Sequence, residues 1–141
     1  MKPIRAAIMA AAVMGMYPIL AHAVTQDNFP PKTARDLVAL CTADKTDPLG
    51  TAALNFCHGY VRGAIDLQEI YAAAERRPVR FFCLPTPPPS FDEGQKRLPQ
   101  WAASHQDQMS ATPIDGLFRF LGDTFPCPPR GSGRISNDER D

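Results

Sequence analysis

The sequence contains few of the residues on which catalytic and metal sites usually depend. Its 141 residues include three histidines and four cysteines, and no two cysteines stand within four residues of each other. This spacing argues against a zinc site, a thioredoxin-like redox pair and c-type haem attachment. There is also no glycine-rich loop of the kind that binds phosphate. We therefore expect no cofactor, no metal and no enzymatic activity.

Clusters of positive charge are equally scarce. Lys and Arg together number 15, and they are balanced by 15 acidic residues. The largest basic group lies within residues 76–80 and follows a predicted helix, whose negative C-terminal end it would neutralise. A nucleic-acid-binding protein would carry a basic face or stripe, so nucleic acid is not an expected partner.

Long apolar runs are confined to the N-terminus. Lys2 and Arg5 precede residues 6–20, which carry no charge, and Ala21-His22-Ala23 follows. This order is that of a secretory signal peptide, residues 1–23, with cleavage expected after Ala23. The alternative is a membrane anchor, but the run is shorter than the roughly 20 residues that span a bilayer. The remaining 118 residues, with 13 basic and 15 acidic side chains, should not span a membrane.

The rest of the chain is predicted to form one domain, residues 24–129, followed by a disordered tail. Residues 130–141 consist mainly of glycine, serine and charged residues, with a single isoleucine. Such a composition buries too little apolar surface to offset the entropy of ordering. No segment of useful length alternates polar and apolar residues as a strand would.

Two helices are predicted in the first half of the domain. Residues 33–41 begin with a capping box at Thr33. Residues 47–75 begin with Asp47 as the cap and Pro48 at the first helical position. This second helix carries a wide apolar stripe, so we expect much of it to be buried, including its tyrosines, Tyr60 and Tyr71.

Two further helices are predicted in the second half. Residues 90–106 open with a capping box at Ser90, and a kink or break is expected just before Pro99, which removes a hydrogen bond. Residues 112–125 begin at Thr112 and show the most regular amphipathic pattern in the chain. The predicted fold is therefore all-α, a small disulfide-stapled bundle of about four helices with one long central helix.

All four cysteines lie within the predicted domain. An even number in a small exported domain indicates two disulfides, and four buried free thiols are the alternative. Three pairings are possible, and the sequence alone does not choose among them. The order of the predicted helices favours a pairing of Cys41 with Cys57 and of Cys83 with Cys127. The first bond would join two consecutive helices, and the second would join the segment after the long helix to the C-terminal end of the domain. In the chain-entropy model these bonds contribute about 3 and about 4 kcal/mol.

Gly59 and Gly63 lie four residues apart inside the long predicted helix, where each costs about 1 kcal/mol relative to alanine. The spacing places both on one face, where another helix could pack closely. That helix could belong to the same chain or to the second copy of a homodimer, and both interpretations stay open.

The candidate catalytic residues have simpler explanations. Cys57 and His58 are adjacent, but successive residues of a helix point about 100° apart, so the two do not form a nucleophile–base pair. A cysteine nucleophile must also be a free thiolate. We interpret His58 and His105 as surface or core histidines, and Trp101 as a core residue.

Taken together, the cysteine-containing motifs resemble those of the Rap/Tai family of type VI secretion immunity proteins, over about residues 34–127. The motifs are Phe56-Cys57-x-Gly59-Tyr60-x-x-Gly63, Phe82-Cys83-Leu84-Pro85 and Phe125-Pro126-Cys127. The resemblance implies a periplasmic, all-helical, disulfide-bonded protein, commonly a homodimer, that binds and blocks a cognate secreted peptidoglycan amidase. The alternatives are a periplasmic helical chaperone of the acid-stress type and a general binding module without a toxin partner.

Overall fold

The structure, a computed structural model, describes residues 23–74 and 79–129. These residues form four α-helices, two short 3₁₀ turns and no strand. The elements follow one another in the order η1 (Gln26–Asn28), α1 (Ala34–Cys41), α2 (Gly50–Ala74), α3 (Phe91–Ser104), η2 (Gln106–Gln108) and α4 (Pro113–Thr124). The prediction of an all-α fold with one long helix is confirmed.

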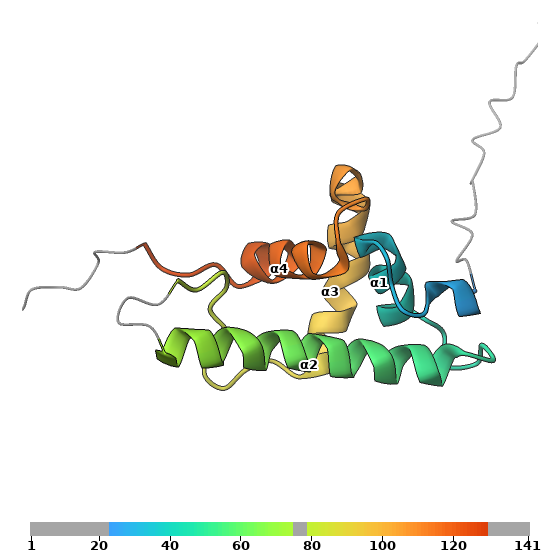
Figure 1. Cartoon of the computed structure of the whole chain (residues 1–141), viewed down its shortest axis with the longest axis horizontal. Coiled ribbons are helices and arrows are strands. Elements are labelled where there is room, and N and C mark those ends of the chain that lie inside the picture. Colours follow the sequence, from blue (N-terminus) through green and yellow to red (C-terminus); the bar gives the residue numbers. More distant parts are fainter. Residues whose placement is uncertain (1–22, 75–78, 130–141) are drawn as a thin grey trace, which may run out of the picture.

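The long helix α2 runs along one side of the molecule, and α1, α3 and α4 lie together on its other side (Figure 1). Helix α1 contacts each of the other three helices. The main core forms where the four helices meet, and it contains Leu37, Cys57, Phe82, Leu98, Trp101, Leu117 and Phe120. A smaller cluster at the start of the domain contains Val24, Leu40 and Ala53.

The predicted starts of three helices are confirmed. Thr33 and Ser90 each open a capping box, in which the side-chain oxygen accepts from a backbone N–H of the first turn. Helix α4 begins at Pro113, and the Thr112 hydroxyl accepts from the backbone N–H of Asp115 at 3.4 Å. These caps satisfy donors that an α-helix cannot satisfy internally.

The start of α2, predicted at Pro48, is wrong by two residues. Asp47 and Pro48 belong to a turn, in which the Gly50 N–H donates to the Asp47 carbonyl at 2.9 Å, and the helix begins at Gly50. A side chain at this position would collide with the carbonyl of Asp44. The turn therefore approaches the helix closely where only glycine fits.

Helix α2 is buried on a narrower face than its apolar stripe predicts. Its buried residues lie on one side, which faces the other three helices, and they are Gly50, Ala53, Cys57, Ala64, Gln68 and Ala72. Tyr60 is half-buried, whereas Tyr71 is 63% exposed, so its assignment to the core is wrong. The reason is that α1, α3 and α4 all lie on one side of α2 (Figure 1).

Gly59 and Gly63 lie on the exposed side of α2. Nothing in the described part of the chain comes within 4 Å of the position that a Cβ would occupy at either glycine. The prediction of a close contact with a helix of the same chain is therefore wrong, because none of the described helices lies on that side. A contact with a second copy of the chain stays a prediction.

Helix α3 continues through Pro99 without the expected break. Leu98 and Trp101, on either side of the proline, are both buried in the core. This packing holds both halves of the helix in line, since tertiary contacts contribute most of the stability of a short helix. The helix ends at Ser104, two residues before the predicted end.

The two disulfides join Cys41 to Cys57 and Cys83 to Cys127, and no described cysteine is free. The first connects the end of α1 to α2. The second connects the segment after α2 to the segment after α4, where the Cys83 N–H also donates to the carbonyl of Phe125 at 2.8 Å. This is the pairing that the order of the predicted helices favoured.

Three predictions fall outside the described residues. These are the signal peptide predicted at residues 1–23, of which the structure describes only Ala23, the end of the long helix near residue 75, and the tail, residues 130–141. Among the helices that the structure describes, none is long and apolar enough to cross a membrane.

Candidate interaction surface

The two histidines of the domain, His58 and His105, do not form a metal site with other described residues. Across residues 23–74 and 79–129, no group of His, Cys, Asp and Glu could hold a metal ion. The His58 ring lies 4.6 Å from that of Phe91. The His105 ring stacks on Trp101 at 4.7 Å, and its Nδ1 lies 2.8 Å from the Trp101 carbonyl oxygen. Each ring therefore has an aromatic neighbour that accounts for its position.

Trp101 lies in the core, as predicted, with 8% of its surface exposed. Its indole Nε1 donates to Oδ2 of Asp123 at 2.8 Å, which connects α3 to α4. A buried indole N–H needs such a partner. Trp101 is therefore a structural residue.

The surface offers a different kind of site, because several large apolar side chains are exposed. They are Leu67, Ile70, Tyr71, Val79, Phe81 and Ile114. Single apolar residues on a surface need no explanation, but a contiguous patch of them marks an interaction site.

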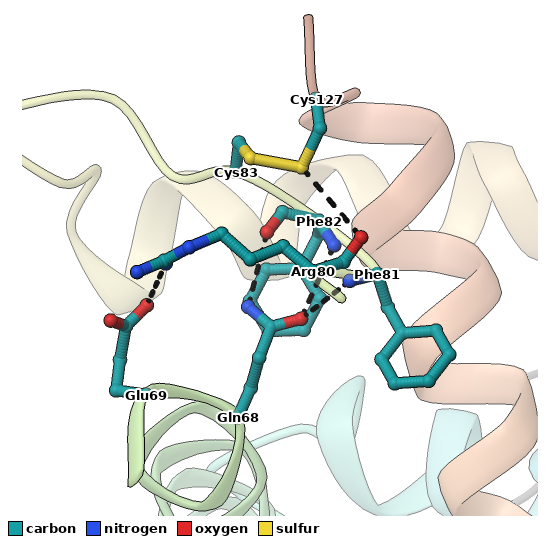
Figure 2. The surroundings of a disulfide bond; sticks show 7 residues. All are labelled: Gln68, Glu69, Arg80, Phe81, Phe82, Cys83 and Cys127. Carbon is teal, nitrogen blue, oxygen red and sulfur yellow. Dashed lines mark hydrogen bonds and ion pairs between the residues drawn. A yellow bond between two sulfur atoms is a disulfide. The ribbon is translucent and has the colours of Figure 1, made fainter. Parts of the chain in front are cut away.

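The backbone that carries Phe81 is bound tightly to α2 through Gln68, a buried amide (Figure 2). The Gln68 Nε2 donates to the carbonyl of Phe82 at 3.0 Å. Its Oε1 accepts from the N–H of Phe81 at 2.8 Å and from that of Phe82 at 3.3 Å. One side chain thus satisfies three backbone groups of a segment that is otherwise outside regular structure.

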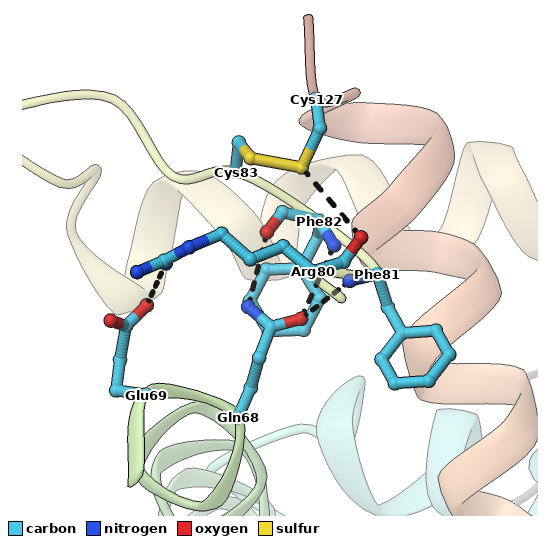
Figure 3. A network of polar contacts seen from close by, with 7 residues as sticks. All are labelled: Gln68, Glu69, Arg80, Phe81, Phe82, Cys83 and Cys127. Carbon is cyan, nitrogen blue, oxygen red and sulfur yellow. Dashed lines mark hydrogen bonds and ion pairs between the residues drawn. A yellow bond between two sulfur atoms is a disulfide. The ribbon is translucent and has the colours of Figure 1, made fainter. Parts of the chain in front are cut away.

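Two further contacts hold the same segment (Figure 3). Arg80 forms an ion pair with Glu69 of α2, with Nη1 and Oε1 separated by 2.7 Å. The disulfide between Cys83 and Cys127 fixes the other end of the segment to the chain after α4. Because Phe82 is completely buried, the extended backbone turns Phe81 outward.

The outward ring of Phe81 lies against α4. Its centroid is 5.2 Å from that of Phe118, and a shallow groove beside it is lined by Phe118 and Ile114. Asp115 and Arg119 stand at the rim of this groove, paired at 3.1 Å. The groove therefore has an aromatic and aliphatic lining with a polar edge.

Exposed residues of α2 lie on the same flank. Figure 2 shows Glu69 on one side of Gln68 and the Phe81 ring on the other. Since successive helical residues lie about 100° apart, Leu67 projects to the Phe81 side, and Tyr71 follows it one turn later. We use the name "Phe81 surface" for the set Leu67, Tyr71, Phe81, Ile114 and Phe118.

This surface was not predicted from the sequence. Nothing in the sequence pattern distinguished an exposed Phe81 from a buried Phe82. Gln68 lies in the row of α2 residues that face the core, and a polar residue in such a row was the available signal. Gly59 and Gly63 are not part of the Phe81 surface but border it, because Gly63 lies one helical turn before Leu67 on α2.

Comparison with known proteins connects this fold to one family. The family model of Rap1a immunity proteins matches residues 33–127, which include all four helices and both disulfides. No curated protein and no solved structure matches the chain. Because the match extends over most of the sequence, the chain belongs to the Rap1a family of immunity proteins.

Proposed function

We propose that this chain is a periplasmic immunity protein that binds and neutralises a peptidoglycan-amidase toxin of a type VI secretion system. Membership of the Rap1a family supports an immunity role. The signal-like N-terminus and the two disulfides are consistent with an oxidising, extracytoplasmic compartment. Neutralisation would then occur by occlusion of the toxin rather than by chemical modification.

The observation that carries the proposal is the Phe81 surface. Its central ring is exposed, yet its backbone is held by Gln68 and by a disulfide. A side chain held in place before binding loses little conformational entropy when a partner covers it. Large aromatic residues of this kind contribute most of the binding energy at protein interfaces. We therefore assign the toxin contact to this surface.

Protection of cells tests the immunity role. A candidate cognate amidase is sought among the genes beside this one. We expect cells that export this amidase to lyse, and co-expression of this chain with its own N-terminus to prevent lysis. Co-expression of the same chain without residues 1–23 should not protect, because the protein would stay in the cytoplasm. Equal lysis with and without the exported chain would contradict the proposed function.

Substitution of Phe81 tests the surface. Phe81→Ala should lower the affinity for the purified amidase by roughly 30-fold or more, as expected for an aromatic residue at the centre of an interface. Lys45→Ala is the control, because Lys45 is exposed in the turn before α2, at the opposite end of that helix from Leu67 and Tyr71. Isothermal titration calorimetry measures both. Equal affinity of the Phe81 and Lys45 variants would contradict this assignment and leave the immunity role standing.

We also propose that the exposed side of α2 around Gly59, Gly63 and Ile70 contacts a second copy of the chain. Residues at these spacings share one helical face. The absence of side chains at the two glycines would allow a second helix to approach closely.

A further inference from the structure

A cavity of about 260 Å³ lies between the four helices, apart from the Phe81 surface. Its lining is mainly apolar and includes Leu37, Val61, Leu98, Trp101, Leu117 and Phe120. Protein interiors are normally packed as densely as organic crystals and contain few voids larger than a water molecule. A cavity of roughly 150 Å³ already admits benzene. The space here is therefore large enough for a small apolar ligand.

The cavity opens to solvent between α2 and the segment before α3. Most of its lining residues are buried or half-buried, whereas His58, Arg62, Pro88 and Ser90 are exposed. The contact between the rings of His58 and Phe91, 4.6 Å apart, places the start of α3 beside α2 at this point. These exposed residues mark the mouth.

The mouth favours an anionic group. Arg62 is the only charged side chain among the lining residues, His58 is the other titratable one, and no carboxylate lines the cavity. Arg62 pairs with Asp66 at 2.9 Å, but both side chains are largely exposed. An exposed ion pair of this kind contributes little to stability. Arg62 can therefore turn from Asp66 to an incoming anion without a large loss of folding stability.

We propose that this cavity binds a single-chain amphiphile with a carboxylate head, of the medium-chain fatty-acid class. The chain would lie among the apolar side chains inside, and the carboxylate would contact Arg62 and His58 at the mouth. An apolar interior with a few convergent polar groups is the usual composition of a small-molecule site. This ligand is independent of the toxin, so the inference goes beyond the proposed function.

The sequence supplies an internal probe for the test. Trp101 lines the cavity and is the only tryptophan of the chain. Titration of the purified full-length mature protein with sodium decanoate, below its micellar concentration, should change the Trp101 emission with saturation at one ligand per chain. Calorimetry of the same titration gives the affinity. Emission that does not change, or changes linearly without saturation, would overturn the proposal.

The head group is tested by charge. Arg62→Gln should weaken decanoate binding tenfold or more and should change the binding of 1-decanol, which has the same chain without a charge, by less than threefold. An equal effect on both ligands would overturn the role of Arg62 and with it the carboxylate assignment.

The cavity itself is tested at Gly94, which lines it and has nothing within 4 Å of a Cβ position. Gly94→Leu should fill part of the space and lower decanoate affinity tenfold or more. Gly94→Ala is the matched control, because it makes the same gain in helix propensity but fills little volume, and its affinity should stay within threefold. Val61→Phe blocks the cavity from α2 and should match Gly94→Leu. Undiminished binding by both blocking variants would overturn the proposal.

Discussion

Gln68 is the only buried polar side chain among the described residues, and it explains how an irregular segment can be held firmly. Its amide has one acceptor and two donors, and the structure uses both kinds on the backbone of Phe81 and Phe82. A buried backbone group needs a hydrogen-bond partner. The amide supplies it where no helix or strand does.

Removal of this amide should therefore destabilise the fold. We expect Gln68→Met, which keeps the length of the side chain, to lower the free energy of unfolding by about 2–4 kcal/mol, because backbone groups of Phe82 would be left buried and unpaired. Urea denaturation measures the loss. Gln106→Met is the control, since that side chain is exposed and bonds a single carbonyl. A loss no larger than that of the control would show that water replaces the amide.

Asp36 gives α1 a stability that depends on pH. Burial raises the pKa of Asp36, but the hydrogen bonds that its carboxylate accepts from Lys32, Thr33 and Asn28 lower this pKa by a larger amount. The net result is a pKa below the ordinary value of 3.8. A lowered folded-state pKa stabilises the protein above the unfolded value, and this contribution is lost as the pH falls through the folded value.

We expect the free energy of unfolding to fall as the pH is lowered from about 5 to about 3, and Asp36→Asn to make this fall shallower. Chemical denaturation at a series of pH values provides the measurement. Other carboxylates titrate in the same range, so the informative quantity is the difference between the slopes of the two proteins. Parallel curves would contradict a contribution from the Asp36 cap.

At the scale of the elements, α3 shows how packing overrides a local signal. Pro99 has no N–H to donate to the Gln95 carbonyl, four residues earlier. Its ring also crowds that carbonyl sterically. The helix nevertheless continues, because Leu98 and Trp101 hold it against the core on both sides of the proline. The sequence pattern contained the penalty but not the packing that outweighs it.

This penalty predicts a stabilising substitution. Pro99→Ala restores the missing donor on an exposed side of α3 and should raise the free energy of unfolding by about 1–3 kcal/mol. Pro126→Ala is the control, since Pro126 lies outside any helix and its loss only increases the entropy of the unfolded chain. Urea denaturation compares the two. A destabilised Pro99 variant would show that the proline shapes the helix as the core requires.

At the scale of the whole molecule, the covering helices lie on only one side of α2 (Figure 1). The opposite side therefore keeps Gly59, Gly63 and Ile70 at the surface. Glycine in a helix interior is unfavourable by about 1 kcal/mol relative to alanine, and no contact within the described chain compensates for it. A second copy of the chain would supply the missing contact.

Gly59→Leu tests this contact. The substitution should not disturb the fold, because nothing lies within 4 Å of the added Cβ, and its better helix propensity should stabilise the monomer by up to about 1 kcal/mol. It should weaken dimerisation at least tenfold by preventing close approach. Sedimentation velocity measures the dissociation constant, with Ala103→Leu, on the exposed side of α3, as the control. A wild-type chain that remains a monomer at high concentration would exclude the dimer.

The sequence by itself determined the fold class, three of the four helix starts and the family resemblance. These features depend on local chemistry. Capping residues such as Thr33 and Ser90 act within one turn, the amphipathic period of residues 112–125 is a property of the segment, and the cysteine motifs are strings of neighbouring residues.

Only the tertiary structure decided which apolar residues are covered. Three short helices cover one side of a long one, so Ala64 and Ala72 are buried while the larger Leu67 and Tyr71 are exposed. Burial depends on where other elements lie, and periodicity does not contain that information. The same holds for Phe81, whose exposure follows from the burial of Phe82 and from a hydrogen bond to an amide thirteen residues away. Both the candidate interaction surface and the cavity arise from such long-range placement.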